Sequence, residues 1–155
     1  KFRNLPLRDG VGIILLNKDN KIFVAKRIDN PKNFWQMPQG GVDKGEDVLS
    51  AAYRELEEET SIKNVKLIKE INKITTYFLP ENLLGIIWKG KYKGQKQKWF
   101  LMRFLGNDTE INIKTDKPEF IEWKWIDLER ITDVVVDFKL EVYKTLKSEI
   151  KKIIN

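Results

Sequence analysis

The chain has 155 residues and a net charge of +6 from 29 basic and 23 acidic side chains, with 41% hydrophobic residues and no histidine or cysteine. This composition suits one globular domain over residues 1–155, and it excludes disulfide bonds, thiol nucleophiles, triads with a histidine base and most zinc sites. Catalysis would therefore depend on carboxylates, Lys, Arg, Tyr or a metal held by oxygen atoms, and the basic excess favours a polyanionic partner, although a lysine-rich solubilising surface would give the same charge.

The chain begins with a predicted β-hairpin. Two apolar, β-prone runs at residues 11–17 and 21–27 flank the turn-forming segment 18–20, and this sequence of strand, turn and strand is typical of a hairpin. After a loop that contains a proline, residues 34–38 are expected to return as a short strand.

Two helices and further strands are predicted in the rest of the chain. A helix over residues 47–60 follows a glycine-rich loop. Strands are predicted at residues 65–79, 85–92, 98–105 and 120–126. A closing helix over residues 136–154 is indicated by apolar residues that recur every three or four positions. These elements predict an α+β (α/β/α) sandwich, with a mixed sheet between the first helix and the C-terminal helix.

The first helix departs from the usual amphipathic pattern. Glu55, Glu58 and Glu59 continue the stripe that Val48 and Ala51 begin, so the face used for packing ends in three carboxylates. Carboxylates a few Å apart repel one another, and raised pKa values or a bound cation must relieve that repulsion. An all-oxygen site suits Mg²⁺ or Mn²⁺. A solvated acidic helix with surface ion pairs would give the same pattern.

The residues around this helix resemble a known motif. From Gly40 the chain reads Gly-Gly-Val-Asp-Lys-Gly-Glu, then seven residues, then Arg-Glu-Leu-Glu-Glu-Glu-Thr-Ser-Ile, which ends at Ile62. This resembles the Nudix box, G-x5-E-x7-R-E-U-x-E-E-x-G-U, in which U is aliphatic. One position departs, because Ser61 stands where the family has glycine, the residue for which a left-handed helix end costs least.

The resemblance implies a metal-dependent catalytic group. Glu55, Glu58 and Glu59 are similar to the family's metal ligands, and Arg54 to the arginine that orients them. Glu119, from outside the box, resembles a fourth ligand or the base, whereas without the box it would be taken for a surface acid. The implied catalytic residues are Glu55, Glu58, Glu119 and Arg54. The identity of the general base stays open.

The loop before the helix is implied to complete this metal site. The carbonyl of Gln39 and Gly40 resemble the loop that adds a backbone oxygen to the metal, and Gly45 and Glu46 complete the box, with Glu46 as an auxiliary acid. A glycine-rich turn before a helix allows backbone to approach an ion and phosphates closely. The implied cofactor is Mg²⁺ or Mn²⁺, with more than one ion per site.

Five residues resemble phosphate-binding positions of the family. These are Arg27, Lys96, Lys98, Tyr77 and Lys139. The guanidinium of an arginine suits phosphate because it is a planar fork of donors. Alternatively, Arg27 and Lys139 are solvated, and the two strand lysines are a basic edge that discourages aggregation.

Three further residues, Arg8, Val136 and Phe138, resemble positions that sandwich the first base. Stacking against an aromatic ring or a guanidinium plane suits a single-stranded 5′ nucleotide. The alternative for Val136 and Phe138 is that both are part of the apolar core.

Similarity beyond the box, at residues 11–13, 35–41, 94–100, 118–120 and 123–125, is to bacterial RNA 5′-pyrophosphohydrolases and dinucleoside polyphosphate hydrolases. It implies hydrolysis of a phosphoanhydride, first that of an RNA 5′-triphosphate with release of pyrophosphate, which initiates mRNA decay. The alternatives are hydrolysis of diadenosine tetraphosphate and, in another class, a non-catalytic module that binds nucleotide or RNA.

The expected partner is thus an RNA 5′ end or a dinucleoside polyphosphate, and no obligate protein partner is evident. No apolar run approaches the roughly 20 residues of a membrane span, and no signal-peptide pattern is visible. We therefore expect a cytoplasmic protein with no membrane partner.

Overall fold

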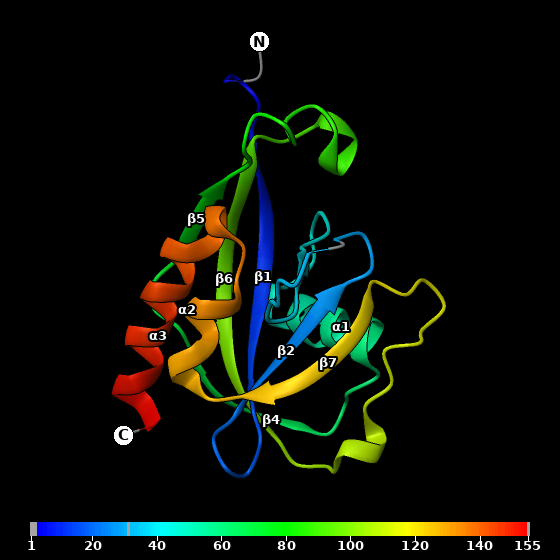
Figure 1. Ribbon diagram of the computed structural model, residues 1–155, viewed down its shortest axis with the longest axis vertical. Helices are drawn as coiled ribbons and strands as arrows, with labels where there is room; N and C mark the ends of the chain where they lie inside the picture. The colour runs from blue at the N-terminus through cyan, green and yellow to red at the C-terminus, as the bar shows by residue number, and fades with distance from the viewer. Residues whose placement is uncertain (1–2, 31, 155) are drawn as a thin grey trace.

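The computed structural model describes residues 3–30 and 32–154, and it contains one mixed sheet with helices on both faces (Figure 1). The strands are β1 (Leu7–Leu16), β2 (Ile22–Arg27), β3 (Gln39–Gly41), β4 (Val65–Glu70), β5 (Thr75–Phe78), β6 (Gly94–Phe104) and β7 (Phe120–Ile126). Their order is β4-β6-β1-β2-β7, while β3 pairs with β1 and β5 pairs with β6. The β1–β6 pair is parallel and the others are antiparallel.

Two layers of core lie on the two faces of this sheet. The helices are α1 (Val48–Thr60), α2 (Ile131–Val134) and α3 (Leu140–Ile154). Alternate residues of β1 point to opposite faces, so that Ile14 packs in a cluster with Tyr143 of α3, and Ile13 packs in a cluster with Leu56 of α1. Side chains buried on both faces fix the register of β1. The predicted α+β sandwich is confirmed.

Several predicted elements are confirmed with changed boundaries. The hairpin is formed by β1 and β2, and residues 120–126 are a strand as predicted. The predicted strand at residues 65–79 is two strands, β4 and β5, that both pair with β6. The helix predicted from residue 136 begins at Leu140, after a 3-10 turn at Asp137–Lys139.

Two strand predictions were wrong. Residues 34–38 contain only a single bridge, between Ala25 and Gln36. The segment predicted as a strand at residues 85–92 contains a 3-10 turn, Ile87–Gly90. Its glycines have φ angles of 80° at Gly85 and 72° at Gly90, and this left-handed backbone cannot continue a strand. β-prone side chains predicted a strand there, but the backbone at the glycines decided the conformation.

The described helices are short relative to a bilayer. None of the helices within residues 3–30 and 32–154 combines the length and the apolar character that a membrane span requires.

Candidate active site

The helix that carries the three glutamates has well-formed ends. At its start the side chain of Asp47 accepts a hydrogen bond from the Ser50 N–H at 3.0 Å, which satisfies a donor that the first turn leaves free. At its end Ser61 has a φ of 65°, and its N–H donates to the Glu57 carbonyl. The Ser61 hydroxyl also donates to the carbonyl of Asn112 at 2.8 Å. A left-handed serine therefore ends this helix where the motif has glycine.

Arg54 organises the carboxylates of this region. Its guanidinium donates to both oxygens of Glu46, at 2.7 and 2.9 Å, and to the Gly41 carbonyl at 3.0 Å. The remaining nitrogen, Nη1, donates to Glu55 at 3.0 Å and to Glu58 at 3.2 Å. The bidentate bond with Arg54 lowers the pKa of Glu46 to about 2. The arginine thus ties the glycine-rich loop to the helix, which is the orienting position expected for it.

Gly40 lies against Glu55, and any larger residue there would have to displace that side chain. A Cβ atom built on Gly40 would meet the Glu55 carboxyl carbon at 2.0 Å. The absence of a side chain therefore allows the loop backbone to approach the carboxylate directly. This close approach brings the predicted loop position and the predicted ligand Glu55 together.

Glu59 and Glu119 meet beside Arg27, at the end of β2. Glu59 is buried, and its Oε1 has no hydrogen-bond partner among the described residues. Burial, followed by the nearby charges of Glu119 and Glu55, raises the pKa of Glu59 well above its ordinary value. Arg27 Nη1 donates to Glu119 at 3.3 Å, and the Glu119 carbonyl accepts from the Ile28 N–H, which fixes the loop of Glu119 to β2. Glu119 thus joins the helix glutamates, although it lies about sixty residues away in sequence.

These residues fit a hard divalent cation by their chemistry. The donors are all oxygens, and a cation would stabilise the charge of the buried carboxylate, which otherwise has no partner at Oε1. Burial also raises the pKa of Glu55, against the effect of its bond with Arg54. Within residues 3–30 and 32–154 no three acidic side chains form a ready-made metal cage, and Glu55 and Glu58 bond Arg54 instead.

A ladder of buried polar side chains lies beside this loop, on β5 and β6. Gln97 Nε2 donates to Gln39 Oε1 at 3.1 Å, and Gln39 Nε2 donates to the Tyr77 hydroxyl at 3.3 Å. Gln95 Nε2 donates to the same hydroxyl at 3.1 Å, and Gln95 Oε1 accepts from Arg8 at 3.0 Å. The ladder holds the side chain of Gln39, whose carbonyl is a predicted metal ligand. Its two β6 glutamines were missed by the sequence reasoning, and the signal was their alternation in Gln95-Lys96-Gln97.

Lys96 and Lys98 lie on the other face of β6 from these glutamines, because successive strand residues alternate. Lys98 Nζ lies 3.1 Å from Glu70, and Lys96 Nζ lies 3.9 Å from Asp9. Tyr77 therefore lies on the same side of β6 as the two glutamines. Lys96 and Lys98, which were predicted to bind phosphate together with Tyr77, lie on the other side.

Lys139 and Phe138 lie against the ring of Tyr77. The Phe138 ring is tilted against the Tyr77 ring, with centroids 5.8 Å apart, and Lys139 Nζ lies 5.2 Å from the Tyr77 centroid. Burial lowers the pKa of Lys139 to about 7, and the charge of Arg27 acts in the same direction. Phe138 also packs against the core cluster that contains Tyr143 of α3, in agreement with the core alternative, and base binding by its ring stays a prediction. Lys139 is buried near Arg27, as a phosphate-binding pair requires.

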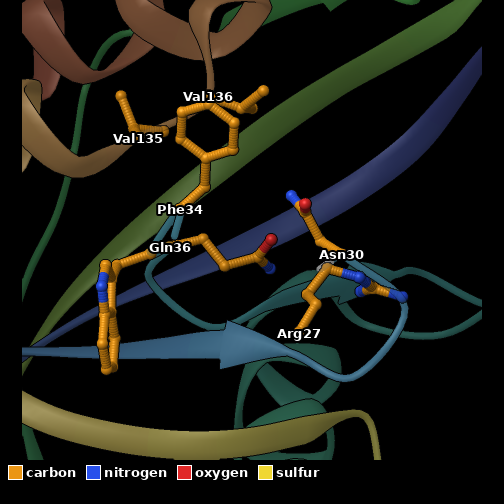
Figure 2. Close-up of a pocket in the computed structure, with 7 residues that line it drawn as sticks. Arg27, Asn30, Phe34, Gln36, Val135 and Val136 are labelled. Carbon is orange, nitrogen blue, oxygen red and sulfur yellow. The ribbon is translucent and has the colours of Figure 1, made fainter. Parts of the chain in front are cut away.

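A small cavity opens beside Arg27, between the β2–β3 loop and the segment after α2 (Figure 2). It has a volume of about 20 Å³, enough for one water-sized group. Its lining residues are Arg27, Asn30, Phe34, Trp35, Gln36, Val135 and Val136. Figure 2 shows the amide of Gln36 directed toward Arg27, and its buried Nε2 has no partner among the described residues. The cavity brings the predicted residues Arg27 and Val136 together, whereas Phe34 and Gln36 were not predicted.

Arg8 was predicted as the wall of the base pocket opposite Phe138, and this stays a prediction. Its guanidinium lies over the Trp88 ring, 5.2 Å from the centroid, and it bonds Gln95. Gln95 bonds the Tyr77 hydroxyl, and the Tyr77 ring contacts the Phe138 ring, so these two residues connect Arg8 with Phe138. Trp88 was not predicted as a site residue, and its segment had been expected to be a strand.

Comparison with known proteins shows similarity along nearly the whole chain. The NUDIX domain model matches residues 6–146. The chain is 77% identical over 152 residues to the RNA pyrophosphohydrolase of Pelagibacter ubique, with 98% of this chain and 96% of that protein covered. It is 47% identical over 146 residues to the RNA pyrophosphohydrolase of Rhodospirillum rubrum, with 94% and 88% covered.

Solved structures are similar in fold. The E. coli dihydroneopterin triphosphate pyrophosphohydrolase superimposes with a TM-score of 0.73 at 19% identity, covering 94% of this chain and 99% of that chain. A C. elegans Ap4A hydrolase has a TM-score of 0.64 at 19% identity, with 92% and 98% covered. At this identity the likeness concerns the fold alone.

Proposed function

Because this chain belongs to the NUDIX domain family, we propose that it hydrolyses the 5′-triphosphate end of RNA and releases pyrophosphate. The reaction leaves a 5′-monophosphate on the RNA, the step that initiates mRNA decay. The observation that carries the proposal is the carboxylate group of α1, in which Glu55 and Glu58 bond Arg54 and Glu59 lies beside Glu119. It is supported by the identity of 77% to a relative named RNA pyrophosphohydrolase.

We propose that Glu55, Glu58 and Glu59, with Glu119 and the carbonyl of Gln39, hold Mg²⁺ or Mn²⁺, in more than one position. Such ions neutralise phosphate oxygens and the leaving pyrophosphate when they are bound. The pairing of Arg54 with Glu46 fixes the guanidinium that orients Glu55 and Glu58.

The remaining residues of the site are proposed to bind the phosphates and the water. Arg27 supplies positive charge to the phosphate chain. Lys139 is buried beside it without an ion-pair partner among the described salt bridges, and a nearby phosphate would favour its protonated form. A carboxylate of the site takes one proton from the attacking water. The water oxygen bonds to the phosphorus next to the RNA, the bond from this phosphorus to the bridging oxygen breaks, and pyrophosphate leaves with that oxygen.

A non-catalytic binding module is not favoured, because a module that only binds its ligand does not require several carboxylates close together, one of them buried. Glu59 is 4% exposed and lies beside Glu55 and Glu119. Repulsion among these carboxylates lowers the stability of the fold unless a bound cation offsets it. The proposal includes a cytoplasmic location, where RNA 5′ ends are present, and a single domain over residues 1–155.

The test compares kcat/KM for 5′-triphosphorylated RNA and for diadenosine tetraphosphate, with the same enzyme and Mg²⁺ concentration. We expect the higher value for RNA, with pyrophosphate as the released product. A higher value for the dinucleotide would replace the proposed substrate by dinucleoside polyphosphates. Absence of hydrolysis of both, in a folded protein with Mg²⁺ or Mn²⁺, would favour the binding module.

A further inference from the structure

The segment 85–93, which we call the Trp88 loop, has an unusual backbone. Trp88 and Lys89 are consecutive non-glycine residues with φ angles of 54° and 59°, a conformation that L-residues rarely adopt. Glycines enclose them, and a Cβ atom on Gly90 would meet the Gly85 carbonyl oxygen at 2.8 Å. Figure 1 shows this loop projecting from the end of the sheet at which β1 begins. A disfavoured backbone on a projecting loop points to a function for the side chains that it presents.

The loop presents a stack of three planar groups. The guanidinium of Arg8 lies 5.2 Å from the Trp88 ring centroid. On the same indole, the Tyr92 ring packs edge-on at 6.1 Å with an interplanar angle of 75°. Trp88 and Tyr92 are only partly buried. Flat aromatic and guanidinium surfaces of this kind are what single-stranded nucleic acids use for base stacking.

The stack is continuous with the proposed phosphate site. Arg8 bonds Gln95, and Gln95 bonds the hydroxyl of Tyr77. Tyr77 in turn contacts Phe138 and lies beside Lys139. Two hydrogen bonds and one ring contact therefore connect Arg8, below the Trp88 loop, with Phe138 beside the proposed phosphate site.

The charge of the loop suits a polyanion. Residues 85–93 contain three lysines and no acidic residue, and two more lysines follow at the start of β6. Lys89 and Lys91 are exposed beside Trp88 and Tyr92, whereas Lys93 donates to the backbone carbonyl of Arg3 at 3.1 Å. Two exposed ammonium groups next to a stacking surface can contact backbone phosphates while the rings contact bases.

We propose that the Trp88 loop, with Arg8, binds the RNA chain downstream of its 5′-terminal nucleotide, through stacking on Trp88 and Tyr92 and phosphate contacts from Lys89 and Lys91. This rests on the proposed function, because it assigns that substrate a second binding region. It gives a reason for preferring RNA over small nucleotides, since only a polynucleotide reaches both regions.

The test measures the affinity of a 5′-monophosphorylated RNA of about six nucleotides by fluorescence anisotropy, and of ATP by competition, at one salt concentration. Trp88→Leu keeps an apolar residue but removes the ring. We expect it to weaken RNA binding roughly tenfold to a hundredfold and ATP binding by a much smaller factor. Trp88→Phe should restore most of the RNA affinity. Ile86→Ser, a change of an exposed residue on the same loop, is the matched control and should leave both affinities unchanged.

Charge and folding are tested separately. Lys91→Gln should reduce the slope of log affinity against log salt by about one. Tyr92→Leu gives a second variant of the stack if Trp88→Leu lowers the melting temperature. Equal losses of affinity for RNA and for ATP would overturn the proposal, and so would unchanged RNA affinity in both Trp88→Leu and Tyr92→Leu. Trp88 would then only anchor its loop. Wild-type protein that binds RNA through Trp88 but releases no pyrophosphate would instead overturn the proposed function alone.

Discussion

The carboxylate end of α1 and the amide ladder of β5 and β6 lie next to each other, but they differ in whether their buried polar groups have hydrogen-bond partners. In the ladder, neutral groups satisfy one another, and the Tyr77 hydroxyl alone accepts from two glutamines. On α1, Glu59 is buried with an unpartnered oxygen beside two other acids. A satisfied network stabilises a fold, whereas buried like charges destabilise it.

This difference separates the supporting structure from the chemical site. The two regions meet at Gln39, whose side chain belongs to the ladder and whose neighbour Gly40 lies against Glu55. The rigid ladder can thus hold the loop in place while the carboxylates keep a geometry that costs stability. Mutations should therefore change activity without loss of stability on α1, and mainly stability in the ladder.

The largest effect is expected for Glu58→Gln. Loss of one proposed ligand should lower kcat by about 100-fold or more, since even indirect partners of a metal cost tenfold to 100-fold. The melting temperature should be unchanged or higher, because repulsion among the acids falls. Glu57→Gln, an exposed neighbour on the same helix, should keep wild-type kcat. Retention of most of kcat in Glu58→Gln with Mg²⁺ would remove Glu58 from the metal site.

Gly40→Ala should come second, because its methyl group must displace the carboxylate of Glu55. A misplacement of about 1 Å can cost on the order of 100-fold in rate, so we expect a loss of kcat of about tenfold to 100-fold. Gly106→Ala is a matched control, since its Cβ would meet the Glu110 carboxylate at 2.3 Å on a loop far along the chain. Similar losses of kcat in both variants would contradict the role of the Gly40 contact.

Tyr77→Phe addresses the ladder. It leaves the amides of Gln39 and Gln95 without their shared acceptor, which should lower the free energy of unfolding by about 1–3 kcal/mol. Urea unfolding measures this change. Tyr53→Phe makes the same substitution at an exposed position of α1 and should have almost no effect. Unchanged stability in Tyr77→Phe would mean that the ladder does not support the site.

The Glu46–Arg54 pair predicts a pH dependence. The pKa of Glu46 is lowered from 4.5 to about 2. Ionised Glu46 therefore stabilises the fold above pH 4.5, and this contribution is lost as the pH falls toward 2. Wild type and Glu46→Gln should thus differ in stability at neutral pH and converge between these pH values, as urea unfolding at several pH values would measure. A constant difference down to pH 2 would exclude this pair as the cause.

The smallest effect is expected at Ser61. Glycine would relieve its left-handed backbone, but it would lose the bond to the Asn112 carbonyl, and the two terms are each on the order of 1 kcal/mol. Ser61→Gly should therefore change the free energy of unfolding by less than about 0.5 kcal/mol. Ser61→Ala loses the bond without relief and should be clearly less stable. A marked stabilisation by alanine would show that the hydroxyl bond contributes nothing.

The sequence by itself determined the parts of this protein that depend on local periodicity. The apolar, β-prone run at residues 11–17, the helical stripe of α1 and the box from Gly40 to Ile62 predicted the central strand, the acidic helix and the family. These signals are readable because the side chains that pack together, or that surround one helix, are spaced by the period of their own element.

Only the tertiary structure decided which side chains from distant segments meet. It placed Glu119, which the family resemblance alone had implied, beside Glu59, and it turned Gln95 toward Tyr77 and put Arg8 over Trp88. The turn at residues 85–90 was also misjudged, because its β-prone side chains favour a strand while two left-handed glycines prevent one. Contacts across the sheet depend on register and on backbone torsions, and neither has a periodic signature in the sequence.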